Sequence, residues 1–186
     1  MRRIVAVCLL FLLIPACGRR QNEMDEILLF RETLLQSQGC TFSCKISADY
    51  GSEVWEFAAD CSADREGNIT FSITAPESIA GIKGQISASG GRFTFDNAVL
   101  GFPLLADGTL SPASAPWIFM RSIRSGYLIS CGHDSEGVRI NVNDSYEDDA
   151  LMLDILMDTD SAPEYAEIFW KGRRILAMDI VNFEIL

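Results

Sequence analysis

The chain has 186 residues, of which 26 are acidic and 15 are basic, so its formal net charge is −11 at pH 7. Such an acidic chain is poorly suited to bind nucleic acid or an anionic membrane surface through charge, because phosphate binding needs clustered Lys and Arg. The length suits one domain with a sizeable hydrophobic core.

The first residues have the pattern of an export signal. Arg2 and Arg3 give a short basic start, and residues 4–14 are eleven apolar residues without a charge. This run has the length of a signal peptide's hydrophobic region and is well short of the roughly 20 residues that a membrane-spanning helix needs. It ends in the letters LIPAC, with an aliphatic residue three positions before Cys17 and a small residue directly before it.

The LIPAC sequence resembles the lipobox of bacterial lipoproteins. In that class of protein the cysteine thiol receives a diacylglycerol, and the peptide is cut just before the cysteine. The resemblance implies that residues 1–16 are a signal peptide and that Cys17 anchors the chain to the extracytoplasmic face of the cell membrane, or to the outer membrane where a cell has two. Two acyl chains give a stable anchor, since each buried methylene contributes about 0.8 kcal/mol. The alternative is an ordinary secretory peptide cut nearby, which leaves Cys17 as a spare thiol.

Cleavage before Cys17 defines the expected mature chain. It removes two arginines and no acid, which leaves 13 basic and 26 acidic side chains and a net charge of −13. Residues 17–23 are expected to be the lipidated cysteine and a short tether, and residues 24–186 a single domain.

The domain is expected to begin with a helix at residues 24–38. Asp25 and Glu26 lie in its first turn, and Gly39 follows it directly. Apolar side chains recur at helical spacing in this segment, at Ile27, Leu28, Phe30, Leu34 and Leu35. The pattern predicts one amphipathic helix with an apolar stripe against the core.

After Gly39 the apolar residues alternate with polar ones, which is the period of a strand with one buried face. The alternating apolar positions are Cys40, Phe42, Cys44 and Ile46, and then Trp55, Phe57, Ala59 and Cys61. A turn centred on Tyr50-Gly51 predicts a hairpin that sets Ile46 opposite Trp55.

The same register sets Cys40 opposite Cys61. Directly opposed residues in a non-hydrogen-bonded antiparallel pair have Cβ atoms roughly 4.5 to 5.5 Å apart, within reach of a disulfide after local twist. An exported chain permits the bond. A Cys40–Cys61 disulfide is therefore one expectation, and free buried thiols are the other. Cys44 and Cys131 then form a second pair or serve as small apolar core residues.

The rest of the chain predicts further strands with one helical interruption. The expected strands are residues 68–75, 79–88, 91–95, 99–106, 126–132, 137–143, 150–157, 162–171 and 174–185. Residues 111–124 offer serine caps, prolines where a helix can start, and several apolar residues, which predicts a short helix. A sheet of this many strands tends to curl, and helices or a ligand must fill its concave face.

Several stretches in this order resemble the LolA-like lipoprotein carrier superfamily: "LLQSQGCTFSC", "TFSITAPESIAGIKGQI", "GGRFTFDN" and "APEYAEIFWKGRRILAMDIVNFEIL". The resemblance implies an α+β, mostly antiparallel β fold. It is a strongly curved open sheet, or half-barrel, with an N-terminal helix and a short central helix on the concave side. The superfamily includes lipoprotein chaperones, lipoproteins that hold lipids in an apolar cavity, and surface lipoproteins that bind another protein. Because this chain carries its own lipidated cysteine, an anchored binding or interaction module is favoured over a shuttle.

The sequence offers little support for catalysis or metal binding. His133 is the only histidine, and no oxyanion-hole glycine motif or third orienting group accompanies it and Cys131. An extended strand separates Cys40 from Cys44, and there is no CxxC pair. The acidic residues Asp144, Glu147, Asp148, Asp149 and Asp154 lack the glycine and spacing of an EF-hand, which favours a solvated hairpin. We expect neither an enzyme nor a cofactor or metal site.

Two functional hypotheses remain. In the first, the domain binds a lipid or other apolar ligand on its concave face. The candidate lining residues are Phe42, Ile46, Trp55, Phe57, Phe71, Ile73, Trp117 and Met120. In the second, these residues form a filled core, and the chain is a surface-anchored scaffold for a protein partner in the cell envelope. A large apolar cavity favours the ligand, whereas a filled interior with an exposed apolar surface or strand edge favours the partner.

Overall fold

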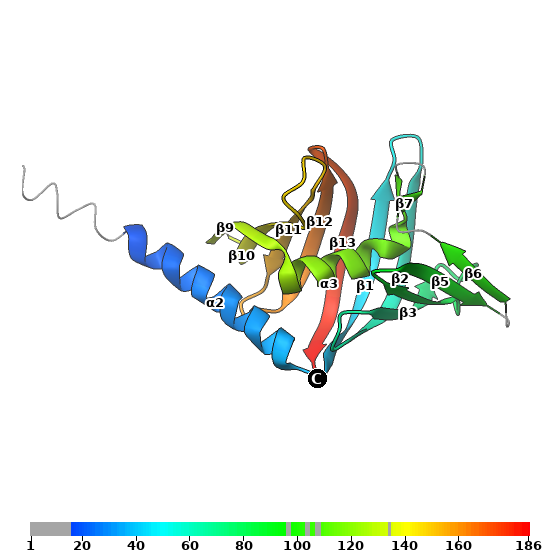
Figure 1. The fold of residues 1–186 in the computed structure, drawn as a ribbon, viewed down its shortest axis with the longest axis horizontal. Helices are drawn as coiled ribbons and strands as arrows, with labels where there is room; N and C mark the ends of the chain where they lie inside the picture. The colour runs from blue at the N-terminus through cyan, green and yellow to red at the C-terminus, as the bar shows by residue number, and fades with distance from the viewer. Residues whose placement is uncertain (1–15, 96–97, 103–104, 107–108, 134) are drawn as a thin grey trace, which may run out of the picture.

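The computed structural model describes residues 16–95, 98–102, 105–106, 109–133 and 135–186. The expected signal peptide, residues 1–16, therefore lies outside the described residues except for Ala16. The described chain forms one long antiparallel sheet with two helices (Figure 1).

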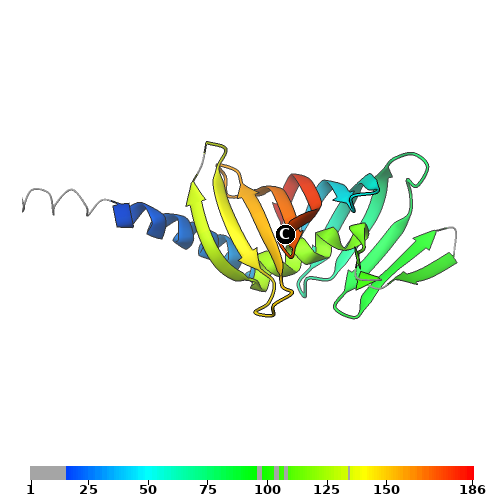
Figure 2. The same ribbon diagram turned by 90° about the horizontal axis from the view of Figure 1, so that it is seen from above.

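The sheet has eleven strands in the order β6-β5-β4-β3-β2-β1-β13-β12-β11-β10-β9. The strands are β1 (Gly39–Asp49), β2 (Val54–Asp64), β3 (Ile69–Ala75), β4 (Lys83–Ser87), β5 (Gly90–Phe95), β6 (Ala98–Phe102), β9 (Tyr127–His133), β10 (Val138–Asn143), β11 (Leu151–Met157), β12 (Pro163–Trp170) and β13 (Arg173–Ile185). Two short strands, β7 (Leu105–Ala106) and β8 (Thr109–Leu110), pair only with each other. The sheet is curved and open, because β6 and β9 end it without pairing (Figure 2). The predicted fold class is confirmed.

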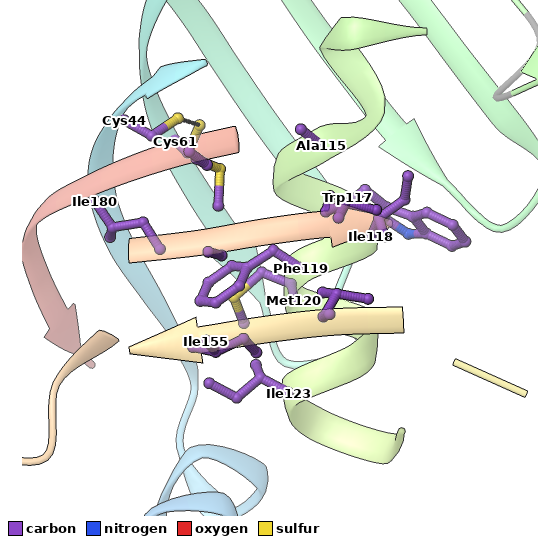
Figure 3. Packing of buried hydrophobic residues seen from close by; sticks show 14 of the residues in the cluster. Cys44, Cys61, Ala115, Trp117, Ile118, Phe119, Met120, Ile123, Ile155 and Ile180 are labelled. Carbon is purple, nitrogen blue, oxygen red and sulfur yellow. Dashed lines mark hydrogen bonds between the residues drawn. The ribbon is translucent and has the colours of Figure 1, made fainter. Parts of the chain in front are cut away.

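The helix α3 (Ala115–Ser125), preceded by the 3-10 turn η1 (Pro112–Ser114), crosses the concave face of the sheet (Figures 1 and 2). This agrees with the helix predicted at residues 111–124. Phe119 and Met120 are fully buried beneath it, and the ring of Phe119 meets that of Phe42 in β1 edge-on, with centroids 5.9 Å apart. Figure 3 shows these side chains turned from α3 toward the strands. The helix therefore fills the middle of the concave face.

The N-terminal helix α2 (Ala16–Gln36) begins eight residues before the predicted start and ends two residues before the predicted end. The expected tether, residues 17–23, is helical and continuous with the rest of α2. Four of the six residues 18–23, GRRQNE, are good helix formers. Arg31 Nε donates to the carbonyl oxygen of Ile123 at 2.8 Å, which ties α2 to the end of α3. The residues that bear the lipid anchor in the sequence prediction are thus part of a helix joined to the core.

Only part of the predicted apolar stripe on α2 is buried. Ile27 and Leu34 are buried, whereas Leu28 and Leu35 of the stripe are each about half exposed, and Leu29 beside the stripe is 64% exposed. The helix touches the fold along a narrow line, so a strip of leucines remains on its surface.

The hairpin of β1 and β2 turns one residue later than predicted. Asp49 pairs with Val54, the Tyr50 amide donates to the carbonyl of Glu53 at 3.0 Å, and Gly51 in the turn has a φ of +88°. An Asp49 side-chain oxygen accepts a hydrogen bond from the Gly51 amide at 2.7 Å and so fixes this turn. The partner of each β1 residue consequently shifts by two positions, which preserves the buried face and changes the pairs.

The shift also separates the two cysteines predicted to form a disulfide. Cys40 lies opposite Ala63, and Cys61 lies opposite Phe42. The Cys40 Sγ instead contacts the Met120 Sδ at 3.7 Å. In the part of the chain that the structure describes, Cys40 and Cys61 are not joined, and both are buried.

Candidate functional site

The concave face is open over the outer strands of one wing of the sheet. Here an apolar groove with a volume of about 410 Å³ runs between strands β2 to β6 and the turn η1. The groove is lined by Trp55, Glu56, Phe57, Ile73, Ile79, Ile82, Phe93, Phe95, Ala98, Leu100, Ser111, Pro112 and Ala113. The volume is within the usual range for ligand pockets, roughly 300–1,000 Å³.

The walls of the groove are apolar and partly exposed. Ile73 is buried at 6% exposure, whereas Trp55 is 56%, Phe95 51% and Leu100 67% exposed. The Trp55 indole N–H donates to a Glu53 carboxylate oxygen at 3.2 Å, so the polar atom of this ring is satisfied at the rim. The groove therefore offers large apolar side chains to whatever enters it.

Charge is nearly absent from this surface. Among the described residues that line the groove, Glu56 is the one charged residue. Its carboxylate forms an ion pair with Lys45 Nζ at 3.1 Å. A ligand inside the groove consequently meets carbon and aromatic surface rather than an ionic partner.

Beneath the groove, the ring of Phe71 packs against Phe93 and against the backbone of Gly84. The rings of Phe71 and Phe93 meet edge-on with centroids 5.9 Å apart. Phe71 lies directly against Gly84 of the neighbouring strand, where a Cβ would come within 2.1 Å of the Phe71 ring. Glycine is thus required at position 84 for Phe71 to occupy its place beneath the groove.

Three of the eight predicted lining residues, Trp55, Phe57 and Ile73, lie in the groove. The other five do not line it. Ile46 and Met120 are fully buried, Phe42 stacks on Phe183, and Phe71 lies below the groove. These four residues belong to the core.

Trp117 is the fifth predicted residue outside the groove. It is mostly buried and also belongs to the core, with the Arg121 guanidinium 5.4 Å from its ring centroid. There it lines a separate hollow of about 690 Å³ with Arg121, Arg124, Glu66 and Asp144. Its walls mix cations, anions and apolar groups, so this hollow is not an extension of the apolar groove.

The sequence prediction missed the part of the groove formed by the turn between β3 and β4 and by strands β5 and β6: Ile79, Ile82, Phe93, Phe95 and Leu100. Phe93 and Phe95 carry a usable signal, because they alternate with Arg92 and Thr94 in β5. Leu100 carries none, since the run around it is continuously apolar and does not show which residues face inward.

The opposite face of the same strands has a larger hollow of about 780 Å³. Its lining is rich in hydroxyl and charged side chains, including Ser43, Asp60, Ser72, Lys83 and Arg92. Ser43 already donates to Asp60 at 2.7 Å. Because its polar groups are solvated or paired with each other, we regard the smaller apolar groove as the candidate site.

The residues considered for catalysis and metal binding differ in burial and in their hydrogen-bond partners. His133 is exposed at the end of β9, whereas Cys131 is buried. In the acidic segment, Asp144 accepts a hydrogen bond from the Leu151 amide at 2.8 Å, and Asp154 pairs with Arg139 at 3.3 Å. The described residues include no group of three or more His, Cys, Asp or Glu side chains placed to hold a metal ion. Among them there is also no helix of the length and apolarity that crossing a bilayer requires.

No protein-family model matches the sequence, and the comparison with curated proteins finds no match either. Solved structures of similar fold include a LolA superfamily protein from Nitrosomonas europaea, with 7% identity, a TM-score of 0.49, and coverage of 90% of this chain and 93% of that one. An uncharacterized conserved protein from Thermus thermophilus has 14% identity and a TM-score of 0.47, with 89% and 86% covered. The lipoprotein LppX from Mycobacterium tuberculosis has 9% identity and a TM-score of 0.43, with 90% and 96% covered. The likeness to these solved structures is one of fold.

Proposed function

We propose that this chain is a non-catalytic lipoprotein, anchored by Cys17 to the extracytoplasmic face of a membrane, that binds a lipid or other apolar ligand in the groove. The observation that carries the proposal is the groove itself. It gathers aromatic and aliphatic side chains from β2, β3, β5, β6 and η1 on one concave surface. Three of these side chains, Trp55, Phe95 and Leu100, are more than half exposed. Exposed apolar surface of this kind is typical of binding sites.

The energetics of such a groove favour an extended hydrocarbon chain. Each methylene transferred from water to an apolar surface contributes about 0.8 kcal/mol, so ten buried methylenes contribute about 8 kcal/mol before association costs. Because the described residues of the lining include no cation, we place a polar head group of the ligand outside the groove, in water.

The proposed anchor rests on the sequence before and at Cys17. The short apolar run and the LIPAC sequence support cleavage after residue 16 and lipidation of the cysteine thiol. The helical course of residues 16–36 supports a closely held domain, because a helix that is fixed to α3 restricts the distance between anchor and sheet.

A protein partner is the second candidate function, and a different observation favours it. Leu28 and Leu29 on α2, together with Ile129 on the edge strand β9, are exposed and lie outside the groove. Large apolar side chains on an edge strand and a neighbouring helix are typical of protein interfaces.

Native mass spectrometry of the full chain, extracted from membranes in mild detergent, separates the two functions. We expect an extra mass that organic solvent extracts as a lipid, and an amino terminus at Cys17 that carries a diacylglycerol. A spectrum that contains only the mass of the chain, without any ligand, would contradict the lipid-binding proposal. Protein-partner binding would then be the remaining candidate function. An intact mass that retains residues 1–16 would contradict the proposed anchor.

Tryptophan emission provides a local measurement of groove binding. Trp55 is 56% exposed in the free groove, whereas Trp117 is 8% exposed in the core. We expect palmitic acid to shift the emission maximum to shorter wavelength, because the ligand replaces water around the Trp55 ring. The Trp55→Phe variant should keep the fold and lose the shift. An equal shift in the variant would place the ligand elsewhere.

A further inference from the structure

Two thiols face each other in the buried centre of the sheet. The Sγ atoms of Cys44 in β1 and Cys61 in β2 are 3.8 Å apart, and the two residues are 3% and 4% exposed. Figure 3 shows the two side chains pointing toward one another across the strand pair. This pair was not expected from the sequence, which favoured Cys40 as the partner of Cys61.

The observed register explains the approach. Cys44 lies opposite Ala59, and Cys61 lies opposite Phe42, so the two cysteines are diagonal neighbours on the inner face. Strand twist brings such neighbours within reach of each other, and the small Ala59 side chain leaves space between them. The Cys40 Sγ lies instead against Met120 of α3.

We propose that Cys44 and Cys61 form a disulfide when the chain folds in an oxidising compartment. This inference rests on the proposed export of the chain. The sulfurs must close from 3.8 Å to a bond of about 2.05 Å, which requires rotation of the two side chains about their Cα–Cβ bonds and a small local movement of the two strands. Closing the bond breaks no ion pair, because each thiol is the hydrogen-bond partner of the other.

The oxidant is an extracytoplasmic dithiol oxidase in its disulfide form. One cysteine thiolate attacks a sulfur of that disulfide and gives a mixed disulfide, and the second cysteine then displaces the enzyme sulfur. The chain loses two electrons and two thiol protons, and the oxidase ends as a dithiol. The hydrogen bond with Cys44 and burial raise the pKa of Cys61 in the folded state, so the thiolate is scarce there. The exchange is therefore placed during folding, before α3 closes the core.

The bond would join the two central strands and close the loop formed by residues 45–60. The far end of that loop carries Trp55 and Phe57, two walls of the groove. The disulfide would thus fix the strand pair that positions one side of the binding surface.

Peptide mapping of the full chain tests the bond directly. The purified chain is reduced, unfolded and refolded in the presence of oxidised glutathione, then alkylated under denaturing conditions and digested with trypsin. Cleavage after Arg31, Lys45 and Arg65 places Cys40 and Cys44 in peptide 32–45 and Cys61 in peptide 46–65. We expect a linked pair of these peptides that disappears on reduction, persists in Cys40→Ala and is absent in Cys44→Ala. Alkylation of both Cys44 and Cys61, or a link that survives in Cys44→Ala, would overturn the proposal.

Thermal unfolding with and without a reductant gives a second test of the bond. Each variant is compared with itself in the two conditions, so the cavity left by a Cys→Ala substitution affects both measurements equally. We expect reduction to lower the melting temperature of the wild type and of Cys40→Ala by about 5–10 °C and to leave that of Cys44→Ala unchanged. A reductant effect of equal size in all three proteins would contradict the pairing. Failure of the proposed export and failure of the disulfide proposal give different results. A chain that is not exported retains residues 1–16 in its intact mass, and refolding with oxidised glutathione still tests whether Cys44 and Cys61 pair.

Discussion

Leu100→Asp is expected to weaken binding of palmitic acid by about 100-fold or more. The Leu100 side chain lines the groove and is 67% exposed, so the free protein tolerates a carboxylate there. A bound hydrocarbon chain would strip water from that carboxylate, and burial of an unpaired charge costs several kcal/mol. A loss of about 2.7 kcal/mol already corresponds to 100-fold in affinity. Titration of Trp55 emission measures the change.

Val99→Asp is the matched control. Val99 is the neighbour of Leu100 in β6, is also 67% exposed, and lines the polar hollow on the opposite face of the sheet. Because successive side chains of a strand point to opposite faces, its carboxylate remains in water when the groove is filled. We expect its affinity to stay within about twofold of the wild type. Equal losses in the two variants would mean that the groove is not the binding site.

The alternation of apolar and polar residues was sufficient to predict most strands and the class of the fold. The inward positions of β1 and β2 were predicted correctly, since a two-residue shift of partners leaves every side chain on its own face. The pairing itself depends on the turn. The hydrogen bond from the Gly51 amide to Asp49 places the turn one residue later, and this local contact decides which cysteines become neighbours.

The sequence could not separate the groove from the core. Phe57 and Phe42 follow the same period in adjacent strands, yet Phe57 lines the groove and Phe42 is buried under Phe119. The difference arises from where α3 lies on the concave face, which is a property of the tertiary packing. Strand patterns show which residues point inward, but they do not show what covers them.

The position of α3 therefore explains both the filled and the open part of the concave face. Phe119, Met120 and Ile123 fill the face over the central strands. The helix is preceded by η1, and Pro112 and Ala113 of that turn form a wall of the groove. Beyond the turn nothing in the described chain covers Phe95 and Leu100, which are 51% and 67% exposed. The groove therefore adjoins the N-terminal end of α3.

Phe119→Ala is accordingly expected to lower the free energy of unfolding by about 3–5 kcal/mol. Phe119 is fully buried, and its truncation leaves a cavity beneath α3 and removes the edge-on contact with Phe42. Urea denaturation measures the change, and the melting temperature should fall by about 10 °C in a chain of this size.

Ser125→Ala on the exposed end of the same helix is the control for Phe119→Ala. The Ser125 hydroxyl donates to the Arg121 carbonyl at 3.0 Å on the surface, so its loss should change the free energy of unfolding by no more than about 0.5 kcal/mol. A loss below about 1 kcal/mol for Phe119→Ala would show that α3 does not fill the concave face. In that case the boundary between core and groove would have to lie elsewhere, because it is the packing of Phe119 that separates them.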